Sequence, residues 1–194
     1  MKRALATALL LVVAVPAIPF KTTVRRGDRV AILRTPMSDT YREEQRVANT
    51  VGLYLRRELR NRGMDAFDAG LTWDELVREG KTDADYYIEV VGGDADSSPI
   101  AGVGVGNRNV GVDVAVVMAH VAATLRLYDG RTLELIDTLD LRRSSAAVMP
   151  TAIGVGRDHF SLWIAIPFVQ GSRYRAAARA VAQDAAEQIA SAGQ

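Results

Sequence analysis

Two neighbouring stretches of the chain carry apolar residues at alternate positions, and this alternation constrains the fold more than any other feature. From residue 115 to residue 127 every odd position is apolar, and Leu133, Leu135, Leu139 and Leu141 again occupy odd positions. A period of two is that of a strand with one buried face. Residues 112–128 and 133–141 are therefore predicted to form a long antiparallel hairpin.

The length of the hairpin loop follows from parity. Asp129-Gly130 is typical of a two-residue turn. Such a turn would pair odd positions with even ones and expose one row of leucines to water. A loop of three or five residues keeps both apolar rows on one face, so we expect the longer loop. Asp137 interrupts the second row and predicts a bulge or a frayed edge there.

The residues before the hairpin alternate between strand and helix patterns. Residues 29–33 form an apolar run of strand length, and residues 64–67 are predicted to form a second strand. Residues 85–91 are rich in aromatic and β-branched side chains and predict a third strand. Between them, residues 40–43 and 72–75 match the capping box that opens a helix. The two helices are expected to end near Gly63 and Gly80.

The remaining residues are predicted to form loops, one more extended segment and a final helix. Residues 92–111 are dense in Gly, Asp and Ser and predict a loop, and residues 144–171 predict a loop followed by a strand or an extended arm. Ser172 is expected to cap a helix over residues 173–192, which carries an apolar stripe. The fold class is therefore α/β (α+β): a single mixed sheet with a long antiparallel hairpin, packed by two or three helices including a C-terminal one.

The first residues predict export from the cytoplasm. Lys2 and Arg3 precede an apolar run over residues 4–14, and residues 15–17 (VPA) offer the small side chains that a signal peptidase reads. The run is shorter than the roughly 20 apolar residues that span a bilayer as a helix. We expect a signal peptide over residues 1–17, cleaved near Ala17, a leader over residues 18–28, and a single domain over residues 29–194.

The composition limits which compartment and which binding partners we expect for this protein. The chain holds no cysteine that could carry a lipid, so the sequence predicts a periplasmic protein that is not a lipoprotein. Its 24 Lys and Arg residues nearly balance its 23 Asp and Glu residues. Such a balance gives no general attraction for nucleic acid or for anionic membranes. A membrane anchor is not predicted, whereas membrane contact and homo-oligomerisation stay open.

No complete catalytic or cofactor motif is found. Residues 102–106 (GVGVG) resemble a dinucleotide-binding loop, but they precede a strand pattern where that loop requires a helix. His120 lies on the polar face of the long strand, and His159 with Ser161 lacks a third partner for acyl transfer. The sequence therefore predicts no catalytic residue, metal or cofactor, and a protein that is not an enzyme.

The order of elements resembles a group of bacterial envelope domains. The residues that carry the resemblance are 29–33 (RVAIL), 54–59 (YLRREL) before 63–65 (GMD), 83–88 (DADYYI), and 125–129 (LRLYD) with Thr132. These are similar to the amino-terminal domain of TolB, to the curli-secretion protein CsgG and to LpoB-type activators of peptidoglycan synthases. The resemblance covers roughly residues 29–142 and a closing helix, and it implies a scaffold or partner protein of the cell envelope.

Two groups of residues are candidates for binding a partner. Phe160, Trp163 and Phe168 could form an aromatic interface, although core packing is the more ordinary explanation. Arg175 and Arg179, four residues apart on the last helix, could face an acidic partner, although solvated arginines are the more ordinary explanation.

Three functions are consistent with these patterns. The first is a non-enzymatic exported adaptor or assembly factor that binds other envelope proteins. The second is an oligomeric outer-membrane secretion or pore-type assembly, with residues 100–117 and 148–166 as candidate membrane hairpins. The third is a small hydrolase or ligand-binding protein whose site the sequence does not reveal.

Overall fold

The strands of the protein form one mixed sheet, with both parallel and antiparallel pairs. The computed structural model describes residues 24–37, 40, 42–80, 83–106, 110–157, 160–165 and 169–191. Within these residues, six strands lie in the order β2-β1-β3-β4-β5-β6. Strand β1 pairs in parallel with β2 and β3, and the later strands pair antiparallel. In chain order the elements are β1 (Arg29–Ile32), α1 (Arg42–Asn61), β2 (Asp65–Asp68), α2 (Trp73–Glu79), β3 (Tyr86–Gly106), β4 (Val110–Asp129), β5 (Leu135–Arg157), β6 (Phe160–Ala165) and α3 (Val169–Ser191).

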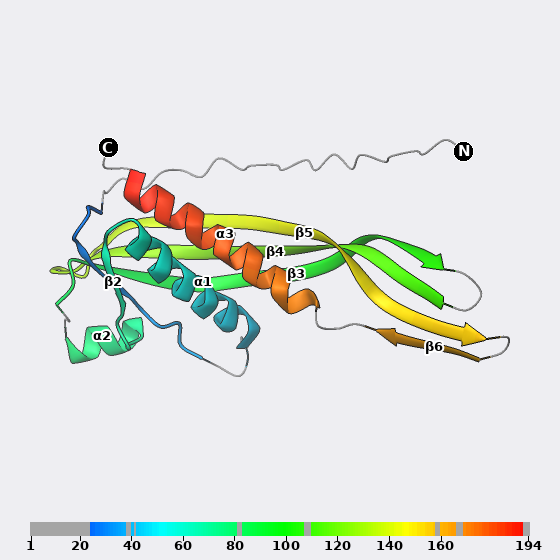
Figure 1. Cartoon of the computed structure of the whole chain (residues 1–194). Coiled ribbons are helices and arrows are strands. Elements are labelled where there is room, and N and C mark those ends of the chain that lie inside the picture. Colours follow the sequence, from blue (N-terminus) through cyan, green and yellow to red (C-terminus); the bar gives the residue numbers. More distant parts are fainter. Residues whose placement is uncertain are drawn as a thin grey trace.

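Helices α1 and α3 lie side by side across one face of the sheet (Figure 1). The main core fills the space between these helices and the strands. Its buried side chains include Val51, Leu55 and Leu59 from α1, Val181, Ala185 and Ile189 from α3, and Leu125, Leu127, Leu139 and Leu141 from the hairpin. The predicted fold class, with a long hairpin and a packed C-terminal helix, is confirmed.

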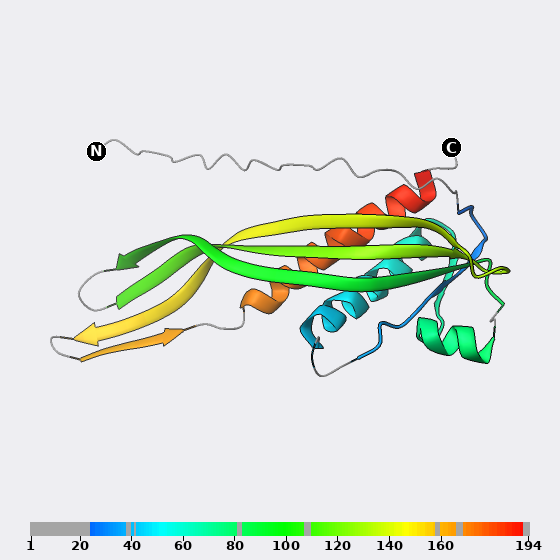
Figure 2. The ribbon, with the colours of Figure 1, turned by 180° about the vertical axis from the view of Figure 1, so that it is seen from behind.

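On the opposite face, the described helices cover the sheet at one end only. Helix α2 packs there, where Leu76 joins Leu33, Tyr87 and Tyr128 in a second apolar cluster. Seen from behind, the middle of the sheet has no helix in front of it (Figure 2). An antiparallel sheet tolerates one solvated face. The polar even-numbered positions of β4 lie on this open face.

The hairpin loop has the length that parity requires. Strand β4 ends at Asp129 and β5 begins at Leu135, so five residues connect them. Leu125 lies opposite Leu139, and Leu127 lies opposite Asp137. A register shift follows, because Tyr128 pairs with Leu135 and Ile136 is the extra residue of a bulge. This bulge turns Leu135 outward, where 53% of it is exposed. The expected continuation of the apolar row to Leu135 is therefore wrong.

The strands are longer than predicted. Residues 92–106 continue β3, and residues 144–157 continue β5, so the loops predicted there are wrong. The hydrogen bonds between paired strands join backbone groups and need no particular side chain. Strand β4 offers backbone partners to both β3 and β5. The two prolines sit beside register shifts, Pro99 at one and Pro150 at another. Bulges are where a strand accepts a proline.

Helix boundaries follow the predictions at α2 and differ at α3. Thr72 caps α2 in a complete capping box with Glu75, and Gly80 follows the helix at φ 92°. Helix α3 begins at Val169, so Ser172 lies inside it and the predicted cap at Ser172 is wrong. A capping residue stands directly before the first helical residue, whereas Ser172 is the fourth residue of α3. The capping box over residues 40–43 falls partly outside the described residues.

Candidate functional site

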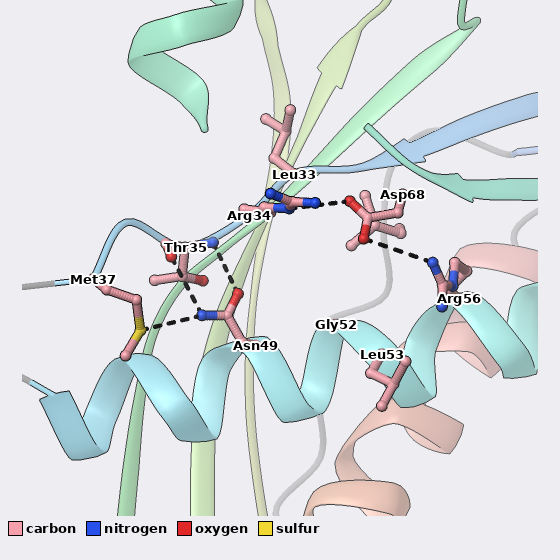
Figure 3. Close-up of a pocket in the computed structure, with 10 residues that line it drawn as sticks. Leu33, Arg34, Thr35, Met37, Asn49, Gly52, Leu53, Arg56 and Asp68 are labelled. Atoms are coloured by element: carbon pink, nitrogen blue, oxygen red, sulfur yellow. Dashed lines mark hydrogen bonds and ion pairs between the residues drawn. The ribbon is translucent and has the colours of Figure 1, made fainter. Parts of the chain in front are cut away.

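A groove lies where the chain leaves the carboxyl end of β1 (Figure 3). In sheets with parallel strands, ligands commonly bind at this end, because the connecting segments diverge there. The cavity measures about 390 Å³. It is lined by the end of β1 and the segment after it, by one side of α1, and by the end of β2: Ile32, Leu33, Arg34, Thr35, Met37, Asn49, Gly52, Leu53, Arg56 and Asp68.

The wall of this β1 groove is held by one side-chain amide. Asn49 Oδ1 accepts a hydrogen bond from the backbone N–H of Thr35 at 3.1 Å, and Asn49 Nδ2 donates to the Thr35 carbonyl at 3.3 Å. The buried Thr35 hydroxyl donates to the carbonyl of Val90 at 2.8 Å. The Asn49 amide thus bonds both backbone polar groups of Thr35, as the backbone of a neighbouring strand would. The segment after β1 is fixed against α1.

The rim of the β1 groove combines charge with exposed apolar side chains. Asp68 lies between two arginines, 3.6 Å from Arg34 Nε and 3.7 Å from Arg56 Nη1. Two guanidinium groups on one carboxylate leave a local surplus of positive charge. Met37 and Leu53 are 59% and 55% exposed beside it. This arrangement suits a ligand or peptide with an apolar group next to a carboxylate.

Arg175 and Arg179 have different surroundings. Arg175 borders a second cavity of about 500 Å³ between α1, α3 and the sheet, together with Glu44, Arg46 and Asp94. Arg179 Nε lies 3.8 Å from Glu58 Oε1, and the same carboxylate is 3.6 Å from Arg62. Arg179 therefore holds α3 to α1, while Arg175 borders the second cavity. Their suggested role in binding an acidic partner stays a prediction.

The other predicted residues lie on β6 or outside the described residues. Phe160, Ser161 and Trp163 belong to β6, whose side chains are not described, and His159 and Phe168 lie outside the described residues. His120 is on the open face, with Nδ1 2.7 Å from the Ser144 hydroxyl oxygen. In the described part of the chain, no three His, Cys, Asp or Glu side chains are grouped so that they could hold a metal. None of its helices combines the length and apolarity needed to cross a bilayer.

The far ends of the long strands form a projecting arm. We define the distal arm as residues 101–106, 110–116, 148–157 and 160–165, which lie beyond the rung formed by Ala101, Val116 and Val148. These strands continue past the ends of α1 and α3 (Figures 1 and 2). The predicted segments 100–117 and 148–166 fall largely within this arm. Val155 on β5 is 58% exposed.

Sequence reasoning missed the β1 groove because its parts are distant in the chain. Arg34 and Asp68 are ordinary charged residues until β1 and β2 pair in parallel. One local signal was available: Leu53 is an apolar residue of α1 that lies off the buried stripe of Val51, Leu55 and Leu59.

Several solved bacterial structures resemble this chain at low sequence identity. The PelC dodecamer from Paraburkholderia phytofirmans matches at 13% identity and TM-score 0.44, over 88% of this chain and 92% of that chain. The minor lipoprotein from Acinetobacter baumannii matches at 13% identity and TM-score 0.43, over 86% and 93%. Rare lipoprotein B from Shewanella oneidensis matches at 9% identity and TM-score 0.34, over 82% and 89%. No family model matches the chain, and the comparison with curated proteins finds no match.

These comparisons correct one prediction and leave another untested. Two of the three proteins are named as lipoproteins, which contradicts the prediction of a periplasmic protein that is not a lipoprotein. That prediction rested on the absence of cysteine. The absence excludes one kind of covalent linkage, a lipid attached to a cysteine, and this is too narrow a basis for the prediction. None of the three is named as CsgG or TolB, so the finer grouping stays a prediction.

Proposed function

We propose that this protein is a non-enzymatic, exported envelope protein that acts as an adaptor or assembly factor by binding other proteins. The observation that carries the proposal is the distal arm, a part of the sheet that α1 and α3 leave uncovered (Figures 1 and 2). Strands without cover from their own chain are surfaces that other chains commonly cover. The resemblance to the TolB, CsgG and LpoB-type domains supports the same reading.

The β1 groove adds a second surface suited to contacts. Its exposed Met37 and Leu53 offer apolar area, and its arginine pair offers charge. Methionine adapts to differently shaped partners, because its side chain is unbranched and polarisable. The groove therefore supports a binding role in addition to the arm.

Site-specific photocrosslinking in living cells tests the proposal. A photoreactive phenylalanine analogue replaces Val155 in the distal arm, and the matched control replaces Val77 on α2, since the two valines are 58% and 57% exposed. We expect adducts with other envelope proteins from position 155, identified by mass spectrometry, and only background from position 77. Equal background at both positions would contradict the proposal.

An oligomeric outer-membrane assembly is the second candidate function. The observation that favours it is the pairing of residues 101–106 with 111–116, which makes the predicted segment 100–117 a hairpin in the arm. Transmembrane strands need about 9–11 residues with one apolar face. Fractionation separates the candidates: an assembly of this type stays with the outer membrane through salt and carbonate washes and needs detergent for release. Release of the protein by these washes would exclude it.

A further inference from the structure

Among the residues that the structure describes, one long edge of the sheet has no strand beside it. Residues 135–151 of β5 pair with β4 on one side. On the other side β6 pairs only with residues 152–157, so within the described part of the chain the rest of this edge has no neighbouring strand. In Figure 1 this part of β5 (yellow-green) forms the rim of the sheet. An unpaired edge is a template for a strand from another chain.

The backbone groups of this edge point outward at even-numbered positions. The carbonyl oxygen of Arg142 accepts a hydrogen bond from a side chain of β5 itself, Nη1 of Arg143, at 3.3 Å. In an antiparallel ladder the bonding direction alternates along the strand. Positions 138, 140, 142 and 144 therefore share this outward direction. The stretch from Asp137 to Pro150 pairs with β4 without a register shift, so the edge is regular over its length.

The edge carries charges of opposite sign two residues apart. Asp140 and Arg142 are exposed on the face away from α1 and α3, while Leu139 and Leu141 are buried on the other face. If two copies of β5 meet antiparallel about Leu141, Asp140 of each copy lies opposite Arg142 of the other. Centring the pair on residue 140 or 142 would oppose two aspartates or two arginines. Opposite charges across strands stabilise a ladder, and like charges destabilise it.

We propose that β5 pairs antiparallel with β5 of a second copy of this chain, centred on Leu141, so that one sheet runs through both copies. The dimer is isologous, because each copy contributes the same edge. The bond from Arg143 to the Arg142 carbonyl is replaced by a backbone N–H of the second copy. Arg143 keeps its ion pair with Asp184, which holds β5 to α3. The dimer does not depend on the proposed binding of other proteins by the distal arm.

Exchanging the charges of Asp140 and Arg142 tests the proposal on the purified protein. Analytical ultracentrifugation gives the dimer dissociation constant of the wild type and of D140R, R142D and the double variant D140R/R142D. Each single variant places two like-charged pairs across the interface, and we expect its dissociation constant to rise by about tenfold. The double variant restores opposite charges, so we expect a value close to that of the wild type.

The double variant also controls for changes within one copy. Asp140 Oδ1 accepts a hydrogen bond from Thr124 Oγ1 at 2.5 Å, and both D140R and the double variant lose this bond. Recovery in the double variant therefore reports the contact between copies. A wild type that stays monomeric at every concentration, or binds only a different protein at this edge, would overturn the proposal. So would a double variant no tighter than the single ones.

Disulfide crosslinking tests the register. The chain has no cysteine of its own. In D140C/R142C, the proposed register places the two introduced cysteines directly opposite each other, within the usual Cα separation of a disulfide. In the control T138C/R142C they are diagonal neighbours, at about 7–8 Å. We expect a covalent dimer on oxidation of the first variant and little from the second. Equal yields, or the reverse order, would contradict the register.

Discussion

The indole ring of Trp73 stacks on the phenol ring of Tyr128, with ring centroids 4.0 Å apart and an interplanar angle of 20°. Trp73 is the first residue of α2, and Tyr128 lies next to the end of β4. The stacked pair and the buried Leu76 attach a seven-residue helix to the face of the sheet that α1 and α3 leave open. A helix this short depends on tertiary contacts for its stability.

Replacing Trp73 tests how far this contact stabilises the fold. We expect Trp73→Ala to lower the free energy of unfolding by about 2–4 kcal/mol, because it removes both buried apolar area and the ring stacking. Trp73→Leu keeps much of the apolar volume, so we expect a loss of about 1 kcal/mol. Urea unfolding followed by circular dichroism measures both. Equal stability of Trp73→Ala and wild type would contradict a stabilising role of the stacked pair.

The raised pKa of Tyr128 makes the stability of the fold depend on pH in the alkaline range. Burial of the phenol, together with its hydrogen bond to Glu89 at 2.9 Å, raises the pKa of Tyr128 to about 12. An unfolded tyrosine titrates near pH 10. The folded state therefore favours the neutral phenol, and this stabilisation is complete below about pH 10 and is lost as the pH rises toward 12.

Absorbance of tyrosinate near 295 nm, combined with unfolding measurements between pH 9 and 12, checks this dependence of stability on pH. The matched variant is Glu89→Gln, which keeps an acceptor oxygen but removes the negative charge. We expect its Tyr128 to titrate at lower pH than in the wild type. An unchanged titration would mean that Glu89 has no part in raising the pKa.

Two adjacent glycines of β3 should respond differently to alanine. A Cβ at Gly93 would lie 2.7 Å from Val47 Cγ1 and 3.1 Å from the backbone nitrogen of Ala48, whereas a Cβ at Gly92 meets nothing within 4 Å. We expect Gly93→Ala to destabilise the fold by about 1–3 kcal/mol, because α1 must move away from the sheet. Gly92→Ala should stay within about 0.5 kcal/mol of the wild type. Thermal unfolding compares the pair, and equal effects would contradict the close approach of α1.

Asn49 should matter for the stability of the β1 groove. Asn49→Ala leaves the N–H and carbonyl of the buried Thr35 without their side-chain partner, and we expect a loss of about 1–3 kcal/mol. Thr50→Ala, one residue further on α1, removes only a hydroxyl bonded to the carbonyl of Arg46 and should have a small effect. Hydrogen exchange at residues 33–37 gives the local readout. Unchanged protection there in Asn49→Ala would contradict the role of this amide.

Local patterns in the sequence predicted most of the body of the fold. The odd-numbered apolar row of β4 continued in Leu139 and Leu141, and this required a loop that preserves parity, as the five-residue loop does. Thr72 and Glu75 marked the start of α2, because a capping box is formed by neighbouring residues and needs no tertiary contact.

Strand length was the main error. Residues 92–106 contain Gly, Asp, Ser and Pro and have low strand propensity, yet they pair with β4 nearly to its start. Strand propensity reflects side-chain packing on a neighbour, and here the neighbour supplies backbone partners whatever the side chain. The pattern of one segment does not contain that information.

Alternation, capping and turn residues in the sequence alone determined which faces are buried, where several elements begin and how long the hairpin loop is, since these features depend on residues a few positions apart. The tertiary structure decided how far β3 and β5 extend, which edge of the sheet stays open, and that Arg34, Arg56 and Asp68 meet at one groove. Those outcomes depend on hydrogen bonds and charges between segments distant in the chain, which arise only when the strands pair.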